Sequence, residues 1–276
     1  MDETKSLGLT WTGHTDPGRV RKNNEDAFLG VRFDANEVQF LGKIGDGSLD
    51  RHDMVFAVSD GMGGANAGEF ASKIVVEQVT RLLPRAFKQT ASGFSAGFED
   101  VLGELFHQIH GELTQLGNAY EECQGMGATL SLVWVTPQWL YFGHIGDSRI
   151  YYFPADGSAI KQLSEDDSHV GWLFRTGKIN EREARNHPRR SSLSKALGAG
   201  HQFVDPQVGA IGLEKGDAFL LCTDGVVEGL FNRQIQRILT DPGVNEAKLA
   251  PAKRIVDAAI AISGKDNTTA LYFQVQ

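Results

Sequence analysis

Short runs of β-branched and aromatic residues follow one another along this chain, and many are separated only by short turns. Runs of this kind, bounded by Gly, Asp or Pro, are typical of β-strands. The predicted strands cover residues 27–33, 37–44, 54–59, 128–135, 138–144, 148–154, 218–222 and 268–275. Connections as short as residues 136–138 and 155–157 favour hairpins, so we expect antiparallel pairing rather than strict strand-helix-strand alternation.

Apolar residues at steps of three and four indicate three amphipathic helices. The first covers about 66–83, the second carries its apolar stripe from Phe98 to Leu116, and the third runs from about Pro251 to Ser263. Two helices are consecutive and one comes late, which favours helices packed outside sheets. The predicted fold is α+β, a four-layer α-β-β-α sandwich of two antiparallel sheets flanked by helices.

Composition narrows the class of protein. The 276 residues carry 27 Lys and Arg against 35 Asp and Glu, a formal net charge of −8, which argues against nucleic-acid binding. Cys123 and Cys222 form no CxxC pair, and no apolar run approaches the roughly 20 residues that cross a bilayer. We expect a cytoplasmic protein without a membrane segment. With no repeat or linker, residues 1–276 are interpreted as one domain, with a polar surface flap over about 164–192.

Four aspartates stand at the ends of predicted strands or just before one: Asp60, Asp147, Asp224 and Asp266. If those strands come together, several carboxylates meet at one edge of the core, where like charges repel unless cations lie between them. Carboxylate and carbonyl oxygens suit Mg²⁺ or Mn²⁺ rather than zinc. The pattern therefore predicts a two-metal hydrolytic centre.

An ordinary turn is the alternative for some of these positions, because Asp-Gly is the commonest hairpin signal. The chain has four such pairs, at 46–47, 60–61, 156–157 and 224–225. Asp46 and Asp156 are interpreted as plain turns. For Asp60 and Asp224 the local pattern leaves both readings open, since a glycine after a metal-binding aspartate also lets its own carbonyl approach an ion closely.

The segment TDPGRVRKNNEDA at residues 15–27 resembles the first motif, TDxGxxRxxNED, of the metal-dependent protein serine/threonine phosphatases of the PPM (PP2C-like) family. Six further blocks match that family in order: DGMGG at 60–64, GMGAT at 125–129, GDSRIY at 146–151, ALG at 196–198, TDG at 223–225 and DNTT at 266–269. The resemblance covers nearly the whole chain. Seven ordered blocks are far more specific than any single one, and they imply the α-β-β-α fold and a phosphatase activity.

The resemblance implies five oxygen donors for two cations, Mn²⁺ or Mg²⁺. Asp60 would bridge the two ions. The Gly61 carbonyl and Glu25 would complete one site, and Asp224 and Asp266 would hold the other. A water shared between two cations loses a proton near neutral pH, and the resulting metal-bridging hydroxide is the expected nucleophile.

Two residues of the first motif are implied to be catalytic. By resemblance, Asp26 would orient the attacking water. Arg21 would clamp the substrate phosphate, a bidentate geometry that a guanidinium meets and an ammonium does not. A solvated surface charge is the alternative for Arg21.

Bacterial members of the family imply a third, weaker metal site. Asp147 resembles the residue that holds it together with Asp224, with a flap residue near Asp167 or Ser168 contributing. The flap sequence over residues 163–189 matches the bacterial pattern, and flaps of this kind are thought to influence substrate choice. A solvated face is the alternative for most of its charges.

Three local features depart from, or compete with, this interpretation. Met62 stands where eukaryotic members have a histidine, so the leaving-group proton would come from metal-bound water or another histidine, and Met62 places the chain in the bacterial branch. Residues 36–53 are longer than the family typically needs and are interpreted as an extended hairpin. Residues 93–97 match the G-x-S-x-G pattern of serine hydrolases, but the preceding residues continue a helix rather than a strand, which argues against Ser95 as a nucleophile.

The resulting prediction is a protein serine/threonine phosphatase that acts on phosphoproteins opposite a serine/threonine kinase, and that is a monomer. A catalytically silent binding module of the same fold is one alternative, but such a protein would typically have lost a metal carboxylate, and all of them are present here. A metal-dependent hydrolase of small phosphoesters is the other alternative, because it would share the site and differ only in substrate.

Overall fold

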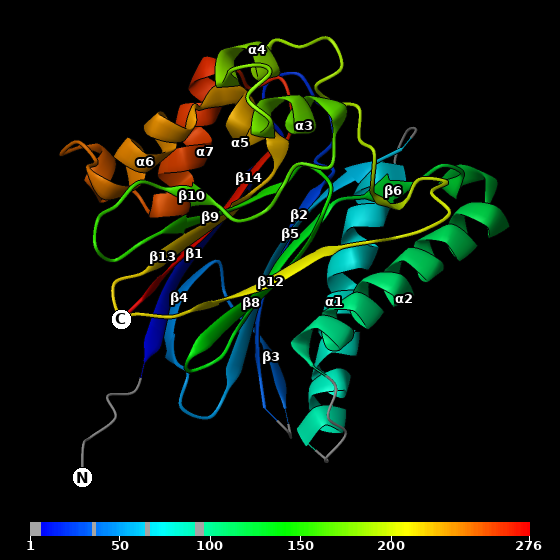
Figure 1. The fold of residues 1–276 in the computed structure, drawn as a ribbon, viewed down its shortest axis with the longest axis horizontal. Helices are drawn as coiled ribbons and strands as arrows, with labels where there is room; N and C mark the ends of the chain where they lie inside the picture. Colours follow the sequence, from blue (N-terminus) through cyan, green and yellow to red (C-terminus); the bar gives the residue numbers. More distant parts are fainter. Residues whose placement is uncertain (1–6, 35–36, 64–66, 92–96) are drawn as a thin grey trace.

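Two antiparallel sheets lie face to face, and helices cover both outer faces (Figure 1). The structure is a computed structural model that describes residues 7–34, 37–63, 67–91 and 97–276. The strand pairs between named elements are all antiparallel in this part of the chain. The predicted α+β sandwich is confirmed.

One sheet has six strands. In spatial order they are β10 (Lys161–Gln162), β9 (Arg149–Phe153), β13 (Ala218–Cys222), β14 (Thr268–Val275), β1 (Gly8–Asp16) and β4 (Ile44–Ser48). The first and last long strands of the chain, β1 and β14, pair in the middle of this sheet along their whole length, from Leu9 opposite Val275 to Asp16 opposite Thr268. This pairing brings the N-terminal motif beside the C-terminal one.

The other sheet has eight strands. Its main path is β11 (Leu197–Gly198), β6 (Gly127–Ala128), β5 (Asp53–Met62), β7 (Leu130–Val135), β8 (Trp139–Ile145) and β12 (Gln207–Gly212), and β2 (Asp26–Phe33) pairs with both β5 and β3 (Val38–Phe40). In most of β2 buried residues alternate with half-buried ones, so one face of this strand is covered more than the other. Every residue of β7 is buried, so both of its faces are covered.

Helices form the two outer layers. They are α1 (Ala67–Ala91), α2 (Phe98–Ala119), α3 (His169–Arg175), α4 (Glu181–Arg185), α5 (Asp224–Gly229), α6 (Asn232–Thr240) and α7 (Pro251–Ile262), with short 3₁₀ turns η1 (Glu121–Cys123) and η2 (Glu246–Lys248). The long pair α1 and α2 covers the eight-stranded sheet, while α5, α6 and α7 cover the six-stranded sheet (Figure 1). The predicted apolar stripe of α2 is buried from Val101 to Leu113, because that face contacts the sheet.

The core between the sheets is built by alternate residues of facing strands. Phe273 on β14 stacks on Phe219 of its neighbour β13 at 5.0 Å and on Phe56 of the opposite sheet at 4.9 Å, measured between ring centroids. All three rings are fully buried. Aromatic contacts of this kind contribute beyond their buried area, so the stack fixes the two sheets against each other.

The interpretation of residues 36–53 as one hairpin is wrong. Asn36 lies outside the described residues, but β3 pairs with β2 in one sheet and β4 pairs with β1 in the other. The segment therefore crosses from sheet to sheet at the edge of the sandwich. Asp46, interpreted as a turn residue, lies inside β4, whereas Asp156 does lie in a turn, in which the Gly157 amide donates to the Pro154 carbonyl at 3.1 Å.

Several elements were not predicted. The strand β1 alternates Leu and Trp with Gly, Thr and His, so its local pattern is weak although it lies at the centre of a sheet. The short helices α5 and α6 and the strand β12 were also missed. The first predicted helix, over 66–83, extends to Ala91.

The contact between α2 and β8 tests the packing of the eight-stranded sheet. Phe106 is fully buried, and its ring lies so close over Gly143 that a Cβ at position 143 would lie 2.6 Å from it. We expect Phe106→Ala to lower the free energy of unfolding by about 3–5 kcal/mol, because the ring leaves a cavity. Urea denaturation measures this loss. The control Phe203→Ala, at a residue that is 85% exposed, should change stability by less than about 0.5 kcal/mol; equal losses in the two variants would contradict the packing described.

Candidate metal centre and active site

Five aspartates from separate elements gather at one end of the two sheets. Asp60 lies in β5 directly opposite Asp26 of β2. Asp147 follows β8, Asp224 opens α5, and Asp266 stands just before β14. The charges of the other four all raise the pKa of Asp60, which requires that they lie near it. The structure therefore brings the predicted strand-end carboxylates together, and neither Asp60 nor Asp224 is a hairpin turn.

Burial is the largest influence on the pKa of four of these carboxyl groups. It raises the pKa of Asp60 and Asp224 well above the ordinary value, and neighbouring carboxylates raise both further. It also raises the pKa of Asp26 to about 7 and that of Asp147 to about 7. A buried cluster of this kind holds its negative charge only if positive charge accompanies it.

Two of these carboxylates keep an oxygen without a partner. The Oδ1 atoms of Asp26 and Asp224 are buried and accept no hydrogen bond. Buried acceptors are nearly always satisfied, so such atoms need an ion or a water. Within the described residues, no three His, Cys, Asp or Glu side chains already stand in the geometry of a formed metal site. The fit to a hard divalent cation therefore rests on the all-oxygen donor set and on these unsatisfied atoms.

Glu25 and Gly61 border one small space. The Gly61 amide donates to the Glu25 carbonyl at 3.0 Å. A Cβ built on Gly68 would lie 2.8 Å from Glu25 Oε1 and 2.9 Å from the Gly61 carbonyl oxygen. Both predicted ligands of one cation thus face the same point at the start of α1. Only a residue without a side chain at position 68 leaves that space open.

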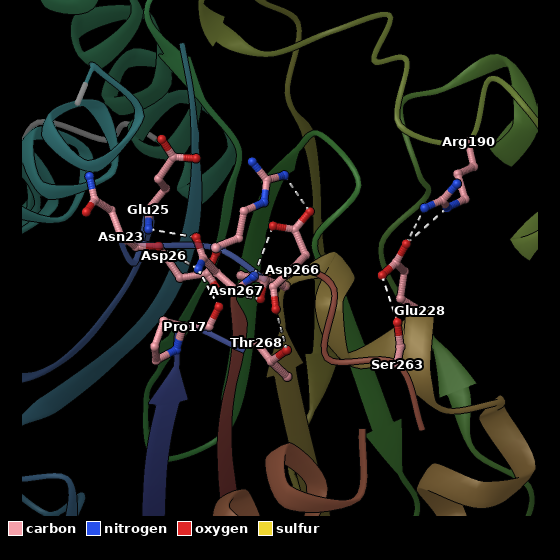
Figure 2. Close-up of polar contacts among 12 residues, drawn as sticks. Pro17, Asn23, Glu25, Asp26, Arg190, Glu228, Ser263, Asp266, Asn267 and Thr268 are labelled. Atoms are coloured by element: carbon pink, nitrogen blue, oxygen red, sulfur yellow. Dashed lines mark hydrogen bonds and ion pairs between the residues drawn. The ribbon is translucent and has the colours of Figure 1, made fainter. Parts of the chain in front are cut away.

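Asn267 holds the first motif against the last one, a role that the sequence did not reveal. Its Oδ1 accepts from the Glu25 amide at 2.8 Å, and its Nδ2 donates to the carbonyls of Pro17 at 3.0 Å and Asn23 at 2.9 Å (Figure 2). Asn267 is almost fully buried. One amide side chain therefore sets where the backbone of Glu25 lies relative to Asp266.

Threonine hydroxyls position Asp26, which sequence reasoning also missed. Thr223 Oγ1 donates to Asp26 Oδ2 at 2.7 Å and accepts from the Thr269 amide at 3.0 Å. This arrangement leaves Oδ1 of Asp26 as the free acceptor. Thr223 directly precedes Asp224, so the same turn that presents Asp224 also orients Asp26.

Thr129 and Ser148 link the strand ends that carry Asp60 and Asp147. Thr129 Oγ1 accepts from the Asp60 amide at 2.9 Å, and the Thr129 amide donates to the Asp60 carbonyl at 2.9 Å. The hydroxyls of Thr129 and Ser148 are 2.8 Å apart. Both side chains are buried, so this neutral pair fixes the backbone of two charged positions.

Arg21 lies at the exposed rim of the acidic cluster. Its Nη2 atom forms an ion pair with Asp266 Oδ2 at 2.8 Å, and the two side chains are 49% and 29% exposed. Its loop lies against the one that carries Asp266, because Gly18 has φ +79° and a Cβ there would lie 2.5 Å from the Asp266 carbonyl oxygen. The structure therefore places the predicted phosphate clamp beside a predicted metal ligand.

The flap begins next to Asp147. Asp167 Oδ2 accepts from the Gly146 amide at 3.0 Å, and the Asp167 amide donates to the Gly146 carbonyl at 2.7 Å. The hydroxyl of Ser168 accepts from the Gly171 amide and caps α3, so of the two flap candidates the Asp167 side chain is the one bound to the loop of Asp147. A cavity between the flap and α5 is lined by both Asp147 and Asp224.

The C-terminal part of the flap, which carries Arg185 and Arg190, binds α5 through Glu228. The carboxylate of Glu228 pairs with Arg190 and accepts from the Ser263 hydroxyl at 3.1 Å (Figure 2). Arg185 donates to the Glu228 carbonyl and stacks its guanidinium on Phe231. Glu228 lies one turn after Asp224 in α5. The flap therefore contacts the same short helix that carries this candidate metal ligand.

The remaining predicted features lie as follows. Met62 ends β5. His144, the histidine nearest in sequence to Asp147, is fully buried, with its ring nitrogens bonded to Ser131 and to the Gly146 carbonyl, so it does not face solvent as a proton donor. Ser95 lies outside the described residues, as does Gly64 of the second motif. In the described part of the chain no helix is both long and apolar enough to span a membrane.

The buried acids make a prediction about stability and pH. In chelator, we expect the free energy of unfolding to rise as pH falls from about 8 to about 6.5. The pKa of Asp26 and that of Asp147, each raised to about 7, lie well above the values of about 3.9 in the unfolded chain, so the folded state binds more protons in this window. Urea denaturation at several pH values measures the slope.

One variant and one further pH range separate the effect of these two aspartates from other effects of pH. Asp26→Asn should make the slope shallower. Below about pH 6.5 the trend should weaken, since burial lowers the pKa of His144 to about 4 and the unfolded chain takes up that proton first. A stability that rises with pH between 6.5 and 8 in chelator would show that these carboxyl groups are not buried together.

Comparison with known proteins identifies the family of the chain. The family model for protein phosphatase 2C matches residues 30–261. The serine/threonine phosphatase stp of Listeria innocua is 33% identical over 259 residues, which cover 93% of this chain and 92% of that protein. The crystal structure of the Mycobacterium tuberculosis serine/threonine phosphatase PstP is 29% identical, with a TM-score of 0.74 over 97% of this chain and 98% of that one. The catalytic domain of PstP in complex with two manganese ions is 27% identical, with a TM-score of 0.74 over 98% of this chain and 99% of that one. The chain belongs to the protein phosphatase 2C family.

Proposed function

We propose that this chain removes phosphate from phosphoserine and phosphothreonine residues of proteins with the help of two divalent cations, Mn²⁺ or Mg²⁺. The observation that carries the proposal is the buried group of aspartates with unsatisfied oxygens at the end of the two sheets. These are the positions that the family motifs occupy. The two manganese ions in the related catalytic domain support the choice of cation.

The position of each proposed ligand in the fold supports the role that we assign to it. Asp60, central among the carboxylates, would bridge the cations. Glu25 and the Gly61 carbonyl would hold one ion, since both face the space beside Gly68. Asp224 and Asp266 would hold the other. When bound, the cations supply Lewis acidity that activates water and polarises the phosphate ester.

The protein's own groups would supply orientation. Thr223 holds Asp26 Oδ2 and leaves Oδ1 without a partner, so Oδ1 would be free to accept a hydrogen bond from the attacking water and orient it. Arg21 would grip two phosphate oxygens from the rim. Its ion pair with Asp266 places the guanidinium at the edge of the cluster.

A third, weaker cation would lie between Asp147, Asp224 and the flap. Asp147 and Asp224 line the same cavity, and the bonds between Asp167 and Gly146 support Asp167 rather than Ser168 as the flap contribution. A cognate serine/threonine kinase, a monomeric state, one domain over 1–276 and a cytoplasmic location stay predictions from the sequence, as does protonation of the leaving group by water or another histidine.

The first test is dependence on metal. With a phosphothreonine peptide as substrate, turnover should require Mn²⁺ or Mg²⁺, and EDTA should abolish it, because the described site offers carboxylates that need cations rather than a nucleophilic side chain. Phosphate release measures the rate. Full activity in chelator would rule out the two-metal reaction. Comparison with p-nitrophenyl phosphate distinguishes a protein phosphatase from a hydrolase of small esters by the ratio of kcat/KM values.

The second test separates the metal bridge from the phosphate clamp. Asp60→Asn and Asp224→Asn should each lower both Mn²⁺ affinity and kcat by orders of magnitude. Arg21→Ala should mainly raise KM. It should change Mn²⁺ affinity by less than about fivefold, since an exposed ion pair contributes about 1 kcal/mol or less.

Calorimetry measures the Mn²⁺ affinities and steady-state kinetics measures kcat and KM. Asp156→Asn is the matched control, an Asp-Gly aspartate in an exposed turn, and should behave as wild type. The role of Arg21 fails if Arg21→Ala loses Mn²⁺ as completely as Asp60→Asn. The catalytic assignment fails if Asp60→Asn keeps wild-type turnover.

A further inference from the structure

A groove lined by polar and apolar side chains crosses the outer face of the six-stranded sheet, at the end away from the aspartates. Strand register places Asp46, Thr10, Gln274, Ala218 and Phe153 in one row across neighbouring strands. All five line one groove. On this face Thr10 and Thr12 of β1 and Tyr272 and Gln274 of β14 are half-buried, while the alternate residues of both strands face the inter-sheet core.

Arg254 lines this groove from α7. Its side chain is inward on the helix and only 8% exposed. Its Nε and Nη1 atoms are buried and have no hydrogen-bond partner. Two buried guanidinium nitrogens without partners are costly, because they have lost their water and gained no acceptor. Such a group calls for an acceptor that binds there.

Two acidic side chains of the same region already form ion pairs with other residues. Asp257 pairs with Lys253 at 2.8 Å, and Glu246 pairs with Arg237 at 3.1 Å. Among the ion pairs found in the described residues, none includes Arg254. Asp46, the acidic residue in the groove, is exposed at the edge strand, where solvent screens it.

The start of α7 adds favourable polarity. Pro251 is the first residue of this twelve-residue helix, and its N-terminal end carries partial positive charge. The Ala252 amide donates to Thr12 Oγ1 at 3.0 Å, which ties the helix start to the groove floor. Thr12 lies opposite Tyr272, so two residues with hydroxyl groups line the groove together with Arg254.

We propose that this groove is an anion-binding site in which Arg254 binds a small oxyanion, a carboxylate or a phosphate. A guanidinium offers the paired donors that both groups accept. The groove is separate from the proposed active site: Gln274 lies six residues along β14 from Thr268, which is roughly 20 Å at 3.3 Å per residue. The inference does not depend on the proposed phosphatase reaction.

NMR of arginine side chains tests the site directly. The Nε–H signal that disappears in Arg254→Met identifies Arg254. In the wild-type chain with the diamagnetic ion Mg²⁺ bound, this signal should shift saturably, in the millimolar range, when succinate or inorganic phosphate is added separately. A response to one and not to the other identifies the ligand class. Phosphate bound at the active site would move Arg21 instead, so the two sites give separate readings.

Thermal unfolding provides a second measurement. In anion-free buffer, Arg254→Met should keep or raise the Tm, because an unpaired buried charge is removed while the apolar stem is retained. Added anion should raise the Tm of the wild type and of the control Lys253→Met by more than that of Arg254→Met, in which only binding at the active site remains. If Arg254→Met does not fold, Arg254→Lys takes its place and should weaken the anion effect. An Nε–H signal that no anion shifts, with equal Tm responses in all variants, would show that only water fills the groove.

Discussion

Mutual repulsion among buried carboxylates is the constraint on which the rest of this structure depends. Asp60, Asp224 and Asp266 come from distant parts of the chain and meet where two sheets end together. Without positive charge, burial pushes the pKa of Asp60 and that of Asp224 upward, and the cluster destabilises the fold at neutral pH. The same arrangement makes a strong site for divalent cations, because each ion removes the repulsion that the fold created.

Neutral side chains hold the charged ones in place. Thr129 fixes the backbone of Asp60, Thr223 turns Asp26, and Asn267 ties Glu25 to the last motif. These groups are buried and donate or accept without adding charge, so they restrict geometry while leaving carboxylate oxygens free. On the rim, Arg21 balances part of the negative charge and remains accessible to a phosphate.

Local sequence was sufficient to predict some strands and helices but not others. The boundaries of β13 and β14 were predicted because both are continuous runs of strand formers. The strand β1 was missed because Gly and Thr alternate with its core residues. Residues 36–53 were misread because the partners of β3 and β4 lie in different sheets. The role of Asn267 was invisible for a related reason: its bond to Glu25 spans 242 residues of sequence.

Proton release on metal binding tests the central claim most directly. Near pH 7 the groups whose pKa is about 7, Asp26 and Asp147, are half protonated in the metal-free chain. Calorimetric titration with Mn²⁺ in buffers of different ionisation enthalpy measures the protons released. The account predicts a net release near pH 7 that becomes smaller at pH 8.5 and smaller again in Asp26→Asn. Tight Mn²⁺ binding with no proton release at pH 7 would contradict it, because the ions would then bind somewhere other than this buried cluster.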